Sequence, residues 1–161
     1  MRSIERCVIA ELPDEARAKI DQYTFLGSTG FARVWGAVGG TAVAWIVVDS
    51  EDIVAALVGV EFRQWPLTRL QMMPDGCYAR LFAQTTVSAE RTQITRELMA
   101  AIGRHGYARV HCADYFHELG LTGSGTRECE TLVVDISDPT WQPPDTKLQS
   151  EIRKAEREGV T

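Results

Sequence analysis

The chain has 161 residues, of which 45% are hydrophobic and 24% charged, and its formal net charge is −5 at pH 7. These values are typical of one soluble globular domain, and the acidic balance argues against a general DNA-binding protein. No apolar run reaches membrane-spanning length, and residues 1–12 carry Glu5 and Glu11 where a signal peptide has its apolar centre. We therefore expect a cytoplasmic protein with no membrane span.

The first quarter of the chain predicts one helix followed by a less regular stretch. Pro13 and the acidic residues after it are typical of a helix start, so a helix is predicted over residues 13–23. Residues 27–30 predict a loop, and residues 31–38 predict an irregular segment or a short strand. The pair Gly39-Gly40 then indicates a turn.

Four strands are predicted next. Residues 41–48 are rich in β-branched side chains and predict a strand that is buried on both faces. Residues 53–62 predict an antiparallel partner for it, and residues 67–73 predict a third strand. After the turn signal Pro74-Asp75-Gly76, residues 77–86 predict the fourth.

The second half of the chain alternates helices and strands. Ser88 and the helical spacing of Ile94, Leu98 and Ile102 predict a long amphipathic helix that ends near Arg104. The remaining predicted elements are a strand over 107–112, a short helix over 113–119, a glycine-rich loop over 120–125 and a strand over 126–136. This order predicts an α/β (α+β) domain with a mixed sheet and helices on its faces.

The cysteines and histidines give no sign of a disulfide or a metal site. Four cysteines are scattered along the chain without a Cys-x-x-Cys pair, which favours reduced thiols in a cytoplasmic protein. They are Cys7, Cys77, Cys112 and Cys129. The cluster of His111, Cys112, Asp114 and His117 spans a predicted strand end and helix start, which favours ordinary polar residues over zinc ligands.

The last segment predicts a separate helix. Pro143 and Pro144 interrupt the structure that precedes it, and Thr146 with Gln149 matches a capping box. Its apolar stripe consists of Leu148, Ile152, Ala155 and Gly159. We therefore predict two parts, a domain over residues 1–138 and a linker with a basic helix over residues 139–161.

This last helix resembles a feature of a known family. Leu148, Ile152, Ala155, Gly159 and Val160, with basic residues between them, are similar to the inter-domain helix of the Fem-type ligases, whose pattern is roughly Arg-x-x-Ile-x-Lys-Ala-x-x-x-Gly-Val. Those ligases are peptidoglycan-bridge aminoacyltransferases related to GNAT-type acyltransferases, and they contain two GNAT-like domains in tandem. The predicted element order and residues 115–121 also resemble the GNAT fold. The resemblance implies that residues 1–138 are the first GNAT-like domain and that the second is absent from this chain.

The resemblance also implies a reaction and an acceptor site. The family transfers an activated acyl group, often an aminoacyl group from tRNA, to an amine. In the peptidoglycan enzymes the acceptor is a muropeptide precursor that bears phosphates, which basic residues of the inter-domain helix help to hold. Gln149 stands where the signature has its arginine, so Lys147 and Arg153 are the nearest cations, and the loop with Tyr78 resembles a family segment near the cleft. The expected acceptor-binding residues are therefore Lys147, Gln149, Arg153 and Tyr78, with no catalytic residue assigned.

The donor site of a GNAT enzyme is missing from the sequence. Such an enzyme binds the pyrophosphate of acyl-CoA with backbone N–H groups at the start of its long helix, and glycines are needed there because Cβ atoms would keep the phosphates away. Ile94 and Arg96 stand where those glycines belong. We therefore expect no bound cofactor. A glycine pattern at Gly120, Gly123 and Gly125 precedes a predicted strand instead of opening a helix, which favours a plain loop.

Two hypotheses on function follow. In the first, the chain is the acceptor-side half of a Fem-like acyltransferase, is inactive alone, and has a second GNAT-like domain or a second copy of itself as partner. In the second, it is a stand-alone, degenerate GNAT-like module that binds a protein or a small molecule without catalysis. A complete single-domain acetyltransferase is opposed by the missing glycines.

Overall fold

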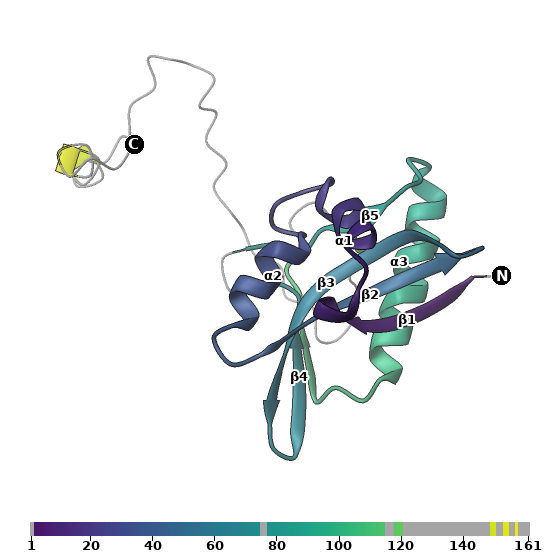
Figure 1. Cartoon of the computed structure of the whole chain (residues 1–161), viewed down its shortest axis with the longest axis horizontal. Helices are drawn as coiled ribbons and strands as arrows, with labels where there is room; N and C mark the ends of the chain where they lie inside the picture. The colour runs from purple at the N-terminus through teal and green to yellow at the C-terminus, as the bar shows by residue number, and fades with distance from the viewer. Residues whose placement is uncertain are drawn as a thin grey trace. The chain divides into compact units, whose positions relative to one another are not determined.

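The computed structural model describes residues 2–74, 77–114 and 118–120, together with the helical positions 149, 150, 153, 154 and 157. The chain divides into two compact units, Met1–Thr126 and Arg127–Thr161. In the first unit, a mixed sheet of six strands carries α-helices on both faces (Figure 1). The predicted loop over 121–125, the strand over 126–136 and the boundary at residue 138 lie outside the described residues.

The elements of the first unit follow one another along the chain in an order close to the predicted one. They are β1 (Ser3–Val8), the 3-10 helix η1 (Ile9–Glu11), α1 (Asp14–Asp21), α2 (Thr29–Gly36), β2 (Thr41–Asp49), β3 (Asp52–Gln64), β4 (Leu67–Gln71), β5 (Leu81–Ala83), α3 (Ser88–Arg104) and β6 (Arg109–His111). The α/β class with a mixed sheet is therefore confirmed. Among the described residues, no helix has both the length and the apolar character needed to cross a membrane.

The sheet has the order β1-β2-β3-β4-β6, and β5 pairs with β3 away from that path. Strands β1 to β4 are joined antiparallel, whereas β6 lies parallel to β4. The long strand β3 pairs with β5 near its start and with β4 near its end, so the chain makes an excursion from the sheet between these two partners, whose described residues are 72–74 and 77–80. Both ends of this excursion bond to the segment that contains β6, through Met72 N to His111 O and Ala79 N to Ala113 O, each 2.9 Å.

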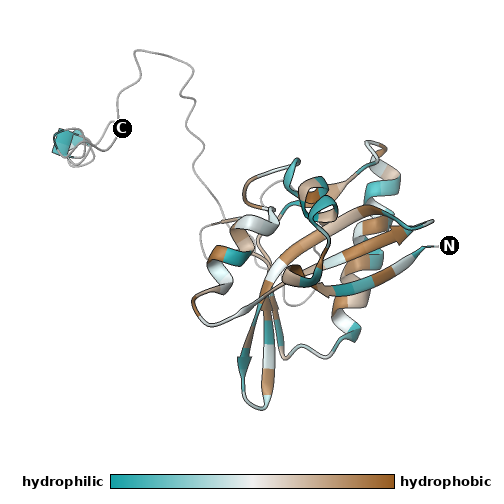
Figure 2. Ribbon diagram, in the orientation of Figure 1, coloured by the Kyte–Doolittle hydropathy of each residue, from teal (hydrophilic) through white to brown (hydrophobic). Residues whose placement is uncertain are grey.

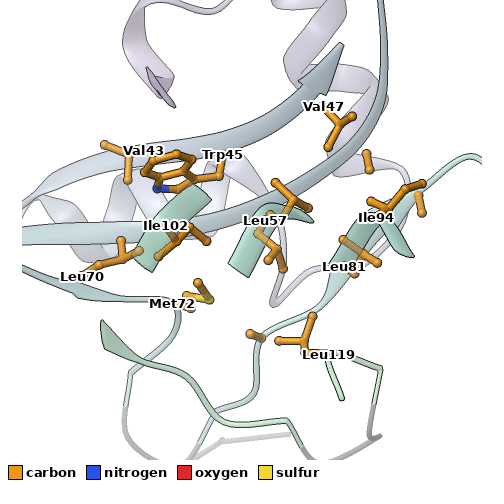
Figure 3. Packing of buried hydrophobic residues seen from close by; sticks show 14 residues of the cluster. Val43, Trp45, Val47, Leu57, Leu70, Met72, Leu81, Ile94, Ile102 and Leu119 are labelled. Atoms are coloured by element: carbon orange, nitrogen blue, oxygen red, sulfur yellow. The ribbon is translucent and has the colours of Figure 1, made fainter. Parts of the chain in front are cut away.

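The core has two layers, one on each face of the sheet. Strand β2 alternates between them: Val43, Trp45 and Val47 belong to the layer under α3, and Ala44 and Ile46 to the layer under α1 and α2. Figure 2 shows the hydrophobic residues concentrated along the central strands, and Figure 3 shows β2 and α3 residues packed together. Burial on both faces is the physical reason for the continuous apolar run that predicted β2.

Several predicted elements are confirmed. The helices over 13–23 and 88–104 correspond to α1 and α3, and the strands over 41–48, 53–62, 67–73 and 107–112 to β2, β3, β4 and β6. Ser88 does not cap α3 as predicted, because Val87 is the N-cap residue and makes no side-chain hydrogen bond there. The predicted strand over 77–86 is reduced to β5, since residues 77–80 belong to the excursion.

The prediction of an irregular segment or a strand over 31–38 is wrong for residues 31–36, which belong to helix α2. The helix starts where two polar side chains satisfy its first N–H groups. Ser28 Oγ accepts from Phe31 N at 3.0 Å, and the Asp21 carboxylate accepts from Thr29 N at 2.6 Å and from Thr29 Oγ1 at 2.9 Å. These caps offset the low helix propensity of the glycines that suggested a loop.

Two further corrections concern the ends of the domain. Strand β1 was not predicted, because its exposed and polar residues interrupt the apolar pattern of an edge strand. The short helix predicted over 113–119 is wrong at the described positions 113, 114, 118 and 119, none of which is helical. There the Asp114 carboxylate accepts hydrogen bonds from the backbone N–H groups of Glu118 and Leu119, both at 2.9 Å, and holds the chain in a bend.

Candidate functional site

A group of charged and aromatic side chains gathers near the start of α3. It consists of Tyr23 after α1, Arg80 before β5, Phe82 in β5, Arg91 in the first turns of α3, and Glu118. We call it the arginine cluster. The loop between α1 and α2 packs closely there, since a Cβ at Gly27 would lie 3.1 Å from the Cβ of Arg80. The elements that surround it are thus far apart in sequence.

One carboxylate serves two guanidinium groups in the arginine cluster. Arg80 Nη2 lies 3.1 Å from Glu118 Oε1, and Arg91 Nη2 lies 3.8 Å from the same oxygen. All three side chains are about four-fifths buried, with 19–21% of their surface exposed. Coulomb interactions in such a position are stronger than at an open surface. The three groups carry a formal charge of +1 when both arginines and the glutamate are ionised.

Tyr23 closes the cluster on one side. Both guanidinium groups lie over its ring, with Cζ of Arg80 at 5.6 Å and Cζ of Arg91 at 5.9 Å from the centroid, within the range of cation–π contacts. Arg91 Nη2 also donates to Tyr23 Oη at 3.4 Å, and Phe82 meets the ring edge-on. The ring therefore orients the two arginines toward one another and toward Glu118.

Glu118 is held in place by its neighbours in the chain and in the core. Its N–H donates to the Asp114 carboxylate at 2.9 Å, and its carbonyl oxygen lies 3.5 Å from Thr95 Oγ1. Leu119, the next residue, is 4% exposed and belongs to the core layer under α3. The backbone that carries the Glu118 side chain is thus anchored by Asp114 and by the burial of Leu119.

The first turns of α3 are filled by side chains. Ile94 and Thr95 are 1% and 2% exposed, and Ile94 packs in the core layer under this helix. Thr95 Oγ1 donates back to Arg91 O at 2.9 Å, and Glu90 accepts from Arg2 at 2.6 Å. The sequence predicts that this segment lacks a site for a pyrophosphate. In the structure its side chains contact the core and Arg2, whereas a pyrophosphate site would need a bare backbone.

A second ionic group lies at the other end of α3. Arg6 of β1 donates two hydrogen bonds to Glu61 of β3, at 2.6 and 2.7 Å, and the Tyr107 hydroxyl donates to the same carboxylate. Burial would raise the pKa of Glu61, but the hydrogen bonds from Arg6 and Tyr107 outweigh it and lower that pKa below its ordinary value. Burial and the bond to Glu61 raise the pKa of Tyr107. Such a closed group stabilises the fold and offers no acid or base near neutral pH.

The four predicted acceptor-binding residues are distributed over both units. Tyr78 is half-buried in the excursion 72–80 of the first unit. In the second unit, Gln149 is half-buried and Arg153 exposed, one helical turn apart, and Lys147 lies outside the described residues. Gln149 and Arg153 therefore lie along one side of the helix, as an acceptor contact by both requires.

The cysteines and histidines form no metal site in the described part of the chain. There, no group of three or more His, Cys, Asp or Glu residues could hold a metal ion, and Asp114 is occupied with backbone N–H groups. Cys7, Cys77 and Cys112 are free thiols, and Cys129 lies outside the described residues. Burial raises the pKa of Cys112 to about 12, so this thiol is not a nucleophile at neutral pH.

Sequence reasoning missed the arginine cluster as a site. It gives no role to the four charged and aromatic residues that meet there, which are Tyr23, Arg80, Arg91 and Glu118. No local spacing connects them, because the cluster forms only when the α1–α2 loop, β5 and residues 118–120 meet at α3.

A search of protein-family models, curated proteins and solved structures finds no match to this chain.

Proposed function

We propose that this chain is the acceptor side of a Fem-like, GNAT-type acyltransferase, which transfers an acyl or aminoacyl group to an amine and needs a second domain to bind the donor. In this proposal the acceptor is a small amine or a muropeptide-like molecule that bears phosphates. The chain alone is inactive, because it supplies no donor site.

The element order supports the GNAT-like part of the proposal. Two helices stand between β1 and β2, an antiparallel meander runs from β2 to β4, and α3 then leads to β6, which lies parallel to β4. Of these elements, the meander, the long helix and the strand after it are in the order expected for the first domain of the family. The excursion with Tyr78 leaves the sheet next to the parallel pair β4 and β6, which suits a residue that meets a ligand.

The observation that carries the proposal is the packing at the start of α3. A pyrophosphate cradle needs N–H groups without obstructing side chains. Here the first turn has no glycine, Glu90 is held by Arg2, and Arg91 contacts Tyr23 and Glu118. A domain of this order without a cradle for acyl-CoA is best suited to the acceptor. The helical, exposed Arg153 then supplies a cation for acceptor phosphates.

The test is acceptor binding by the whole chain and by a matched pair of variants. We expect a UDP-linked muropeptide to bind with an affinity that falls about tenfold in Arg153→Ala, because one charge-assisted hydrogen bond is lost. Lys154→Ala removes the same charge from the neighbouring exposed position, which faces away by about 100° of helix rotation, and should change the affinity little.

Calorimetric titrations at low and high salt measure both effects. The loss in Arg153→Ala should shrink as salt rises, since exposed charges are screened beyond about 10 Å at 0.1 M ionic strength. Equal losses in both variants, or no saturable binding by the unaltered chain, would contradict the proposal.

A further inference from the structure

The arginine cluster contains an anion that belongs to the chain itself. Glu118 Oε1 lies between the guanidinium groups of Arg80 and Arg91, at 3.1 and 3.8 Å. Two arginines around one oxygen are donors of the kind that proteins use to bind phosphate or carboxylate groups, and Tyr23 Oη accepts a hydrogen bond from one of them, Arg91. The side chain of Glu118 therefore stands where a ligand anion would stand.

We infer that Arg80, Arg91 and Tyr23 form a binding site for a small oxyanion, a phosphate or a carboxylate, and that Glu118 occupies this site from within the chain. The inference depends on the contacts of this cluster alone and is independent of the acceptor proposed above. In the unaltered protein the site is closed to free anions as long as the Glu118 carboxylate remains.

The contacts of Glu118 are those of an anchored occupant. The Asp114 carboxylate accepts hydrogen bonds from the N–H groups of Glu118 and Leu119, and the Leu119 side chain is buried in the core. Because the backbone is held in this way, the carboxylate is present at a high effective concentration, and a free anion must compete with an intramolecular partner.

The Glu118 carboxylate does not satisfy all the hydrogen-bonding groups of the arginine cluster, and in this it differs from an ordinary ion pair. Glu118 Oε2 is buried and makes no hydrogen bond among the described residues. The contacts of Arg91 are also long, at 3.4 Å to Tyr23 Oη, 3.4 Å to Thr85 O and 3.8 Å to Glu118. By contrast, Glu61 uses both oxygens on Arg6 at 2.6 and 2.7 Å. A free oxyanion with more acceptor oxygens can satisfy Arg91 better than the tethered carboxylate does.

The test removes the Glu118 carboxylate and supplies a free oxyanion in solution. In Glu118→Ala, inorganic phosphate and acetate should each raise the thermal unfolding temperature above that in sodium chloride of the same ionic strength. The apparent Kd for phosphate should be at least about tenfold lower than in the unaltered chain, as expected when strong hydrogen bonds to a charged group become available. A gain with only one of the two anions assigns the site to that anion.

Three further variants make the result specific. Glu90→Ala removes the same charge near the same helix start and leaves the exposed Arg2 behind, and we expect no phosphate-specific gain. Arg91→Gln added to Glu118→Ala should abolish the gain. Glu118→Asp keeps the charge but withdraws the carboxylate, so it should show a smaller gain, and it serves if the alanine variant does not fold. The inference is overturned if neither residue-118 variant gains more from phosphate or acetate than the unaltered chain does, or if the gain survives Arg91→Gln.

Discussion

Truncation of Leu98 to alanine is expected to lower the free energy of unfolding by about 2–5 kcal/mol, because it leaves a cavity in the core. Leu98 is fully buried in α3 and belongs to the core layer that also contains Trp45, Leu57 and Ile94. This layer is the only apolar support of α3 against the sheet among the described residues, so no neighbouring element can take its place.

Urea denaturation at neutral pH measures this loss. Arg96→Ala on the exposed face of the same helix is the matched control, and its effect should stay within about 0.5 kcal/mol. A loss below about 1 kcal/mol for Leu98→Ala would mean that α3 does not pack against the sheet as described. The described arrangement of the arginine cluster near the start of α3 would then be wrong as well.

Replacing Glu61 by glutamine is expected to cost about 2–3 kcal/mol at pH 7. The change leaves Arg6 without the carboxylate that accepts two of its hydrogen bonds, in a position where the glutamate side chain is 11% exposed. Glu5→Gln on the same strand as Arg6 makes the same chemical change at an exposed position, and it should cost less than about 0.5 kcal/mol.

The cost of Glu61→Gln should depend on pH in a defined direction. The pKa of Glu61 in the folded protein lies below its ordinary value, because hydrogen bonds from Arg6 and Tyr107 outweigh the effect of burial. A lowered folded pKa contributes stability that is fully present above the unfolded pKa and is lost as pH falls through the folded value. The stability difference between the unaltered chain and the variant should therefore be constant above about pH 5.5 and shrink below about pH 4.5. A difference that grows with acid would contradict the assignment of the pair.

The elements that sequence reasoning located well are those whose pattern is decided locally. The spacing of Ile94, Leu98 and Ile102 marks one buried face of a helix, and α3 has the bounds expected of it. The apolar runs of β2 and β3 are buried on both faces, which a run of β-branched residues indicates by itself.

The elements that sequence reasoning missed depend on distant partners. Helix α2 begins because Asp21, at the end of α1, accepts hydrogen bonds from Thr29. Strand β1 carries Arg6, whose charge is neutralised only by Glu61 of β3. The arginine cluster is the extreme case, since its residues come from four segments and no spacing connects them. Long-range ionic and capping contacts of this kind leave no periodic signal in one sequence.

The central claim is that this chain serves the acceptor and not the acyl-CoA donor, and calorimetric titration of the whole chain with acetyl-CoA tests it most directly. The account predicts no saturable heat, because the first turn of α3 has no glycine and carries Glu90 and Arg91, whose side chains are held by Arg2 and by Glu118. A saturable isotherm in the micromolar range, lost on substitution of Thr92 and Thr95, would contradict it.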